Sequence, residues 1–213
     1  MEFKNFLRKI KSCFKKFWFL LWKDESLKGW IFSVIFIFIF IKFIFFPILS
    51  FLTGTSLPLA IVESCSMYHK GNFLSNYDEW WNIHESKYLE LGVEKRVFEN
   101  FNFKKGFNKG DILFIMGIKP EKLKIGDVII FNAGQKNPVI HRIIKIENKN
   151  GGYVFSTIGD NNNGQLEIEK SINSDEIVGK AFFKIAPYVG WGKLIFFESK
   201  RPASERGLCE ERT

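Results

Sequence analysis

The spacing of hydrophobic positions changes along the chain, and the first pattern covers residues 1–28. Apolar side chains recur there at intervals of three and four positions, with lysines between them. This pattern is typical of a basic amphipathic helix on a membrane surface, although a helix packed on a domain has the same spacing. We favour the membrane surface, because tryptophan and lysine suit the headgroup region. The apolar positions are Phe3, Phe6, Leu7, Ile10, Phe14, Phe17, Trp18 and Leu21, and the lysines are Lys9, Lys11, Lys15 and Lys16.

Residues 29–52 form an almost unbroken apolar run. At ~1.5 Å per residue, a helix of this length measures about 36 Å, enough to cross a hydrocarbon core of ~30 Å with some tilt. The run therefore predicts a transmembrane helix, because it is too long for a buried soluble helix or a cleavable signal peptide. Lys42 interrupts the run, and we expect it to reach the membrane surface or to face a partner subunit or the following domain.

The distribution of charge predicts which way the chain crosses the membrane. The net charge is +8, and residues 1–28 hold eight of the 31 lysines and arginines, whereas residues 49–68 hold none. The positive-inside rule places the N-terminus in the cytosol and everything after residue 52 outside, in a single-pass protein of the cell membrane. No nucleic-acid-binding motif accompanies the basic residues, so we expect the lipid bilayer, and no nucleic acid, as their partner.

Beyond the apolar run, residues 53–198 have the sequence pattern of a β domain. Short apolar runs alternate with turn formers, which indicates a mainly antiparallel sheet or a partly open barrel. No glycine-rich phosphate loop is present, which argues against nucleotide binding. The expected strands are residues 59–62, 111–116, 127–131, 139–146, 153–158 and 177–185.

A predicted helical insertion interrupts the β-strand pattern between residues 70 and 105. Asn76 is a candidate N-cap for its main helix and Gly92 a candidate stop, and a shorter helix is expected around residues 94–101. We expect the aromatic stripe to pack on the domain, with a lid facing a membrane or partner as the alternative. The stripe comprises Tyr77, Trp80, Trp81, His84, Tyr88 and Leu91. The tail, residues 199–213, has no pattern that assigns it a role.

The three cysteines, Cys13, Cys65 and Cys209, lie far apart in the sequence and form no CxxC pair. This spacing argues against a zinc site and against a disulfide framework. We therefore expect no metal and no cofactor.

Two serines after the first predicted strand are the candidate site of nucleophilic chemistry. In an extended segment Ser64 and Ser66 share one face and Cys65 the other. Ser66 is then the candidate nucleophile, and Ser64 could donate its hydroxyl to an oxyanion; alternatively, it makes an ordinary strand-end hydrogen bond. Cys65 as the nucleophile is a minor variant of this reading.

Serine chemistry also requires a base and a group that orients the base. His141 lies in a predicted strand and is the candidate base, although a histidine on an apolar strand face is usually a hydrogen-bonded core residue. His69 is too close to Ser66 in sequence for both groups to reach one substrate atom readily. Asp160 is the candidate orienting acid, although its Gly-Asp-Asn context is also an ordinary turn.

These segments together resemble the ordered motifs of type I signal peptidases, the membrane-anchored serine proteases that remove signal peptides. His141 stands where most bacterial members have lysine, so the resemblance points to the archaeal and endoplasmic-reticulum branch. The matching segments are Ser64-Cys65-Ser66-Met67, Lys109-Gly110-Asp111-Ile112, Ile125-Gly126-Asp127-Val128, Pro138-Val139-Ile140-His141-Arg142 and Gly159-Asp160-Asn161-Asn162.

The chain departs from this family in three places. Cys65 replaces a glycine, Tyr68-His69 replaces the usual residue-proline pair, and no second aspartate follows Asp160 by five or six positions. Either Asp160 orients His141 alone, or Glu167 reaches in, with Glu169 ranked behind it.

The resemblance implies an endopeptidase that cleaves signal peptides of preproteins after translocation, near the protein-translocation machinery. The substrate would lie extended against Leu59, Ala60, Ile61 and Val62, adding a strand to the sheet edge. The alternatives are a catalytically inactive signal-peptidase-like subunit and a membrane-anchored interaction domain that docks through the aromatic insertion.

Overall fold

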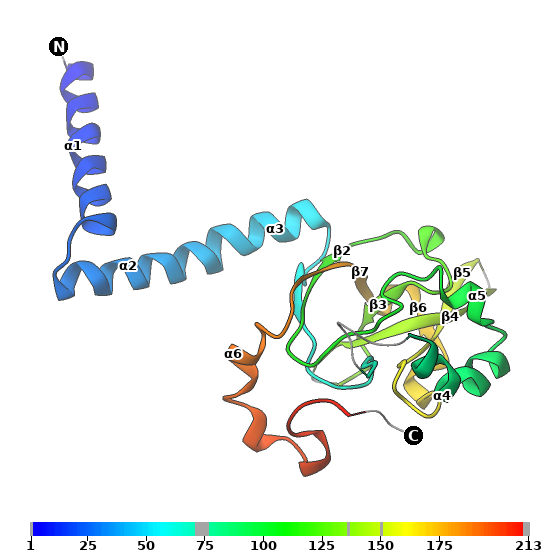
Figure 1. Cartoon of the computed structure of the whole chain (residues 1–213). Coiled ribbons are helices and arrows are strands. Elements are labelled where there is room, and N and C mark those ends of the chain that lie inside the picture. Colours follow the sequence, from blue (N-terminus) through cyan, green and yellow to red (C-terminus); the bar gives the residue numbers. More distant parts are fainter. Residues whose placement is uncertain (1, 71–76, 136, 150, 211–213) are drawn as a thin grey trace. The chain divides into compact units, whose positions relative to one another are not determined.

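The computed structural model describes residues 2–70, 77–135, 137–149 and 151–210, and the chain divides into two compact units, residues 1–52 and 53–213. Figure 1 shows the helices of the first unit and the sheet of the second.

The first unit is helical. Helix α1 (Glu2–Trp22) is followed by α2 (Leu27–Phe40), a π-helical turn (Ile41–Phe45) and α3 (Phe46–Thr53). The Ser26 hydroxyl accepts a hydrogen bond from the amide of Gly29 and so caps the start of α2. A side chain at Gly29 would collide with Asp24, 2.5 Å from its main-chain oxygen, so the turn between α1 and α2 requires glycine there.

The helix Leu27–Thr53 is long and apolar enough to cross a membrane, with a mean hydropathy of 2.7. Pro47 lacks the amide that would bond one turn back, and the wider π-helical turn just before it accommodates the proline ring. Lys42 is exposed, and its Nζ lies 5.3 Å from the centre of the Phe43 ring and 6.0 Å from that of Phe38. Its aliphatic stem and charge therefore lie along the aromatic surface of the same helix.

The second unit contains a curled antiparallel sheet of seven strands in the order β1-β2-β7-β3-β4-β5-β6. The mainly β, signal-peptidase-like fold expected from the sequence is thus confirmed. Strand β6 was not expected; it is only two residues long and has no readable alternation. The strands are β1 (Leu59–Ile61), β2 (Ile112–Met116), β3 (Val128–Phe131), β4 (Val139–Lys149), β5 (Gly152–Ile158), β6 (Ile172–Asn173) and β7 (Ile177–Ala186).

Strand β3 lies near the centre of the sheet and is buried on both faces. Val128 and Ile130 pack into one apolar cluster with Leu113 of β2, whereas Ile129 and Phe131 pack into another with Phe155 of β5. Both clusters exclude water from the middle of the sheet, which makes it a rigid support for side chains at its ends.

Two Gly-Asp pairs form the turns that lead into β2 and β3. Gly110 and Gly126 have φ of 90° and 92°, values that strain any other residue. The carboxylate of Asp111 accepts the amide of Asn108 and pairs with Lys184, and that of Asp127 accepts the amide of Lys124 and pairs with Lys180. These two motifs therefore have structural roles: they set where the central strands begin.

The insertion folds as α4 (Tyr77–Glu90) and α5 (Lys95–Phe98) and packs on the sheet, as the sequence predicted. Its buried residues Trp80, Trp81, Tyr88 and Phe98 form one cluster with Ile144 and Ile158 of the sheet. Helix α4 ends at Glu90, the expected stop Gly92 (φ 74°) follows two positions later, and the amide of Val93 donates back to the carbonyl oxygen of Tyr88. Asn76, the expected N-cap, lies outside the described residues.

Candidate active site

The two candidate serines lie in the turn that follows β1. Main-chain bonds hold this turn from two sides: the amide of Asn161 donates to the carbonyl of Ser66 (2.8 Å), and the amide of Phe107 donates to that of Met67 (2.7 Å). The hydroxyl oxygens of Ser64 and Ser66 lie 3.0 Å apart, so the two side chains share one side of the turn. The segment is a bend rather than an extended strand, but Ser64 and Ser66 still lie together, as expected.

His141 brings an imidazole to Ser66 from β4, where it pairs with Ile129 of β3. Its Nε2 lies 2.8 Å from Ser66 Oγ, a distance at which the ring accepts the hydroxyl proton. The ring is 3% exposed, whereas Ser66 is half-buried and accessible. Gly159 makes this approach possible, because a Cβ there would lie 2.9 Å from His141 Nε2 and 2.8 Å from the carbonyl oxygen of Ser66.

The carboxylate on the far side of His141 belongs to Glu169. Its Oε1 accepts a short hydrogen bond from His141 Nδ1, and its Oε2 accepts the amide of Leu166 at 2.7 Å. Glu169 is fully buried. Both oxygens are therefore fixed, and the carboxylate selects the tautomer of His141 that carries its proton on Nδ1.

From the sequence, Glu169 ranked behind Asp160 and Glu167 as the acid that orients His141. Glu167 instead points into solvent, where its side chain is 87% exposed and pairs with Lys170 at 2.5 Å. The short 3₁₀ turn Glu167–Glu169 distinguishes the two glutamates. Glu169 lies three positions after Leu166, the residue that precedes the turn, and its carboxylate accepts the amide of Leu166. This capping turns Glu169 inward and leaves Glu167 outside.

Asp160, expected to orient His141, lies in a separate buried cluster. Its Oδ1 accepts bonds from Tyr88 (2.7 Å) and Arg142 Nε (2.9 Å), and its Oδ2 accepts from Arg142 Nη2 (2.6 Å) and His69 Nε2 (2.9 Å). The alternation of β4 explains the difference. His141 and Arg142 are consecutive and point to opposite faces, and Asp160 lies on the face of Arg142.

Arg142 connects three parts of the domain. Besides Asp160, its guanidinium donates to the carbonyl oxygens of Asn102, Phe103 and Gly126, at 2.8 to 3.0 Å, and lies over the Phe98 ring. It is completely buried, so these bonds replace the water that its charge has lost. The residue therefore ties β4 to the insertion and to the turn before β3.

Burial and charge set the pKa values in this cluster. Burial alone would raise the pKa of Asp160, but the charge of Arg142 and the hydrogen bonds from His69 and Arg142 outweigh it and hold that pKa well below the usual range. Burial lowers the pKa of His69 despite its bond to Asp160, so its ring is neutral at neutral pH. The neutral ring stacks on Trp80, with 3.7 Å between centroids.

We expect Asp160→Asn to lower the free energy of unfolding by about 3–5 kcal/mol, because it leaves the buried charge of Arg142 without its partner. Since the pKa of Asp160 is depressed in the folded state, its contribution to the free energy of unfolding is present in full above about pH 4. That contribution is lost only as the pH falls below this value. Denaturant unfolding of the full chain in detergent micelles measures the change. The control, Asp175→Asn on an exposed turn, should shift it by less than about 0.5 kcal/mol. A fully stable but inactive Asp160→Asn protein would contradict this structural role.

Ser64, Ser66 and His141 line an open cleft of about 1300 Å³ in the second unit. The four expected substrate-binding residues, Leu59 to Val62, line one side of it, and Val139 to His141 line another. Strand β1 is at the edge of the sheet, so one side of its main chain is not paired to a neighbouring strand. An extended peptide fits beside such an edge.

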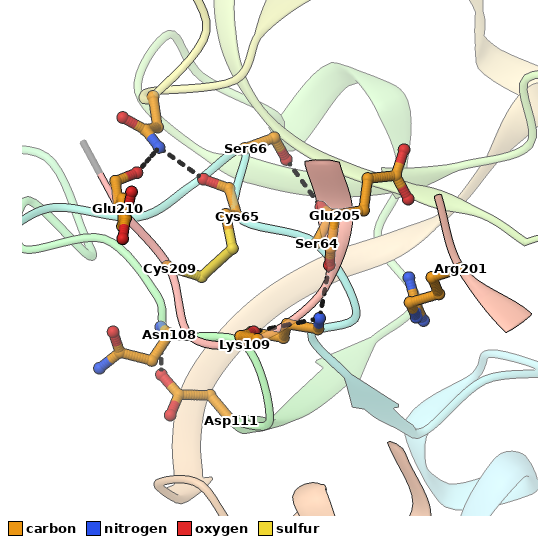
Figure 2. Close-up of a disulfide and its surroundings, with 12 residues drawn as sticks. Ser64, Cys65, Ser66, Asn108, Lys109, Asp111, Arg201, Glu205, Cys209 and Glu210 are labelled. Atoms are coloured by element: carbon orange, nitrogen blue, oxygen red, sulfur yellow. Dashed lines mark hydrogen bonds between the residues drawn. A yellow bond between two sulfur atoms is a disulfide. The ribbon is translucent and has the colours of Figure 1, made fainter. Parts of the chain in front are cut away.

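Cys65 is bonded to Cys209, although the spacing of the cysteines argued against a disulfide framework. The two cysteines are 144 positions apart in sequence, but the tail returns to the turn that holds the serines, as Figure 2 shows. Sequence spacing could not indicate this contact, because it depends on the path of the whole domain. With its sulfur in the disulfide, Cys65 is not available as the nucleophile suggested as a variant. Cys13 is a free, exposed cysteine.

No metal-binding cluster of three or more His, Cys, Asp or Glu occurs among the described residues. Hydrogen bonds link the hydroxyl of Ser66, the imidazole of His141 and the carboxylate of Glu169 in one chain. Such a chain of hydrogen bonds can take a proton from the serine as the serine attacks a carbonyl carbon.

Comparison with known proteins finds similarity to signal peptidase catalytic subunits. The human signal peptidase complex catalytic subunit SEC11C is 34% identical over 100 residues, which are 42% of this chain and 50% of that protein. The chain resembles type I signal peptidases. The catalytic subunit sec11 of Dictyostelium discoideum is 31% identical over 82 residues, 35% of this chain and 45% of that protein.

A further relative is the human putative catalytic subunit SEC11B, which is 30% identical over 93 residues, 40% of this chain and 55% of that protein. No family model matches the chain. The chain spans about half the length of the curated relatives it matches. These similarities confirm the resemblance predicted from the motifs.

Proposed function

We propose that this protein is a membrane-anchored serine endopeptidase that cleaves signal peptides from preproteins. The observation that supports it most directly is the continuous hydrogen-bond chain from Ser66 through His141 to Glu169 at the edge of a peptide-sized cleft. The similarity to signal peptidase catalytic subunits supports the substrate class.

In the proposed reaction, Ser66 Oγ attacks the scissile carbonyl carbon while His141 Nε2 accepts its proton. Glu169 stabilises the imidazolium that forms and holds the ring in place. The developing oxyanion takes hydrogen bonds from the Ser64 hydroxyl and the amide of Ser66. His141 then gives its proton to the leaving amine, and water hydrolyses the acyl-enzyme by the same route in reverse.

The substrate is placed by the edge of β1. The C-terminal part of the signal peptide lies extended beside Leu59 to Val62, and its main chain supplies the hydrogen bonds of an added strand. Shallow apolar surfaces there accept small side chains at the first and third positions before the cut. The transmembrane helix, with its basic N-terminal side in the cytosol, keeps the domain close to translocated signal peptides and the translocation machinery, which raises their effective concentration.

The proposal is tested with the full-length chain in lipid vesicles. We expect it to cleave a preprotein after the signal peptide, and a serine-directed phosphonate to label Ser66, as mass spectrometry of the labelled peptide would show. Absence of both cleavage and labelling, in a folded protein, would instead support a non-catalytic subunit that only binds signal peptides.

A further inference from the structure

The C-terminal segment 198–210 passes beside the candidate nucleophile, although neither the proposed chemistry nor the sheet requires it. Seven residues of this segment line the same cleft as Ser66 and Leu59 to Val62: Arg201, Ala203, Ser204, Glu205, Arg206, Leu208 and Glu210. The cleft keeps about 1300 Å³ of open space with the segment in place, so the segment borders the cleft and does not fill it.

The segment is fixed covalently next to the serines. The Cys65–Cys209 disulfide joins it to the residue directly before Ser66, with 5.3 Å between the two Cα atoms. Asn161 adds a bridge on the same side, since its Nδ2 donates to the carbonyl oxygens of Cys65 and Glu210, both at 3.0 Å. Figure 2 shows the disulfide and these two bonds beside Ser66.

A second attachment is the side chain of Lys109, which comes from the turn before β2. Lys109 is 1% exposed, and its Nζ donates to the carbonyl oxygens of Glu205 (2.7 Å) and Gly207 (3.2 Å) and to the carboxylate of Glu198. A buried ammonium with three acceptors from one segment holds that segment's main chain in a defined position.

The third attachment is at Glu63, in the segment that leads from β1 to the serines. Arg201 pairs with Glu63 at 2.9 Å, and Glu63 directly follows the four residues expected to bind substrate. Lys193 and Asn137 bond to the same carboxylate, each at 3.1 Å. The segment is thus held near both ends of the path from Glu63 to Ser66, with its cleft-lining residues between the attachments.

We propose that residues 201–210 form a wall of the peptide-binding cleft and contact the bound signal peptide, and that the Cys65–Cys209 disulfide holds this wall in place. The proposal rests on the proposed function for the identity of the peptide. The segment determines which peptides fit, because it limits the width of the cleft opposite β1. It takes no part in proton transfer.

The test measures peptide binding separately from cleavage. The full-length Ser66→Ala protein, with Cys13→Ser as a common background, is titrated with a fluorescent peptide of about ten residues that has alanine at the first and third positions before the cut. Fluorescence anisotropy gives the Kd. We expect Cys209→Ser to raise this Kd about tenfold, which corresponds to a loss of about 1.4 kcal/mol. Reduction of the parent protein should have the same effect.

A second pair of variants leaves the disulfide intact. Ser204→Trp introduces a large ring into the cleft and should raise the Kd at least as much, whereas Ser199→Trp, outside the cleft lining, should leave it unchanged. An unfolding curve for each variant shows that it is folded.

An unchanged Kd for both Cys209→Ser and Ser204→Trp would overturn the proposed wall, as would the absence of peptide binding to the Ser66→Ala protein. Failure of the proposed function looks different: the peptide binds and responds to both variants, but the protein with Ser66 intact cleaves nothing.

Discussion

Replacement of Ser66 by alanine should reduce kcat for signal-peptide cleavage by about 10⁶-fold, since loss of the nucleophile removes the covalent route. The hydroxyl of Ser66 is the one that lies 2.8 Å from His141 Nε2, in a turn that main-chain bonds from Asn161 and Phe107 hold in place. The alanine side chain removes one oxygen and leaves those main-chain bonds intact. Stability and peptide binding should therefore remain near those of the unaltered protein. Cleavage of a preprotein in vesicles, followed by gel shift of the mature product, measures the loss.

Ser64→Ala is the matched control for this change. Ser64 lies 3.0 Å from the same hydroxyl but is not bonded to His141, so its loss should remove one oxyanion donor and reduce kcat by about 10²–10³-fold. Equal losses for the two serines would show that the assignment of the nucleophile is incorrect. Cleavage that survives Ser66→Ala would refute it directly.

Glu169→Gln should reduce kcat by about 10⁴-fold with little change in KM, which is the known cost of replacing the acid of a Ser-His-Asp triad by its amide. The new carboxamide can still accept the amide of Leu166 through its oxygen, but its NH₂ group then faces His141 Nδ1. This favours the tautomer with the proton on Nε2, and that nitrogen can no longer accept the proton of Ser66. Steady-state kinetics give kcat and KM separately.

Glu167→Gln is the control for the acid. Glu167 is two positions away and exposed to solvent, so its variant should keep the activity of the unaltered protein. The Asp160→Asn variant provides a second comparison, because we expect it to lose stability first and activity only as a result. Should Glu169→Gln retain activity while a folded Asp160→Asn protein loses it, the acid would be Asp160, as the sequence had suggested.

The parts of the site that local pattern determines were predictable. The short apolar runs between turn formers located β3, β4 and β7, and the predicted strand that holds His141 does bring it to Ser66. The predicted proximity of Ser64 and Ser66 also holds, because both belong to one short turn. These features depend on residues within a few positions of one another, so the sequence alone is enough to predict them.

The features that the sequence did not reveal, the role of Glu169 and the disulfide, depend on how segments without regular secondary structure run through the folded domain. Glu169 reaches His141 because a 3₁₀ turn directs it inward, and the residues between β5 and β6 have no periodicity that reveals such a turn. The Cys65–Cys209 bond depends on the return of the tail across the domain. Asp160 misled the prediction because a buried carboxylate near a histidine suits both catalysis and an ion pair, and only the burial of Arg142 distinguishes the two.

The position of Arg142 has a consequence for how the domain loses its structure. Its five N–H groups are shared between Asp160, the insertion and the turn before β3, so separation of the insertion from the sheet would break its bonds to Asn102 and Phe103 and expose its ion pair with Asp160 to water. The insertion and the sheet should therefore open as one cooperative unit rather than in sequence. Although the insertion looks like an addition to the strands around it, its removal would take two carbonyl acceptors, those of Asn102 and Phe103, from the guanidinium of Arg142.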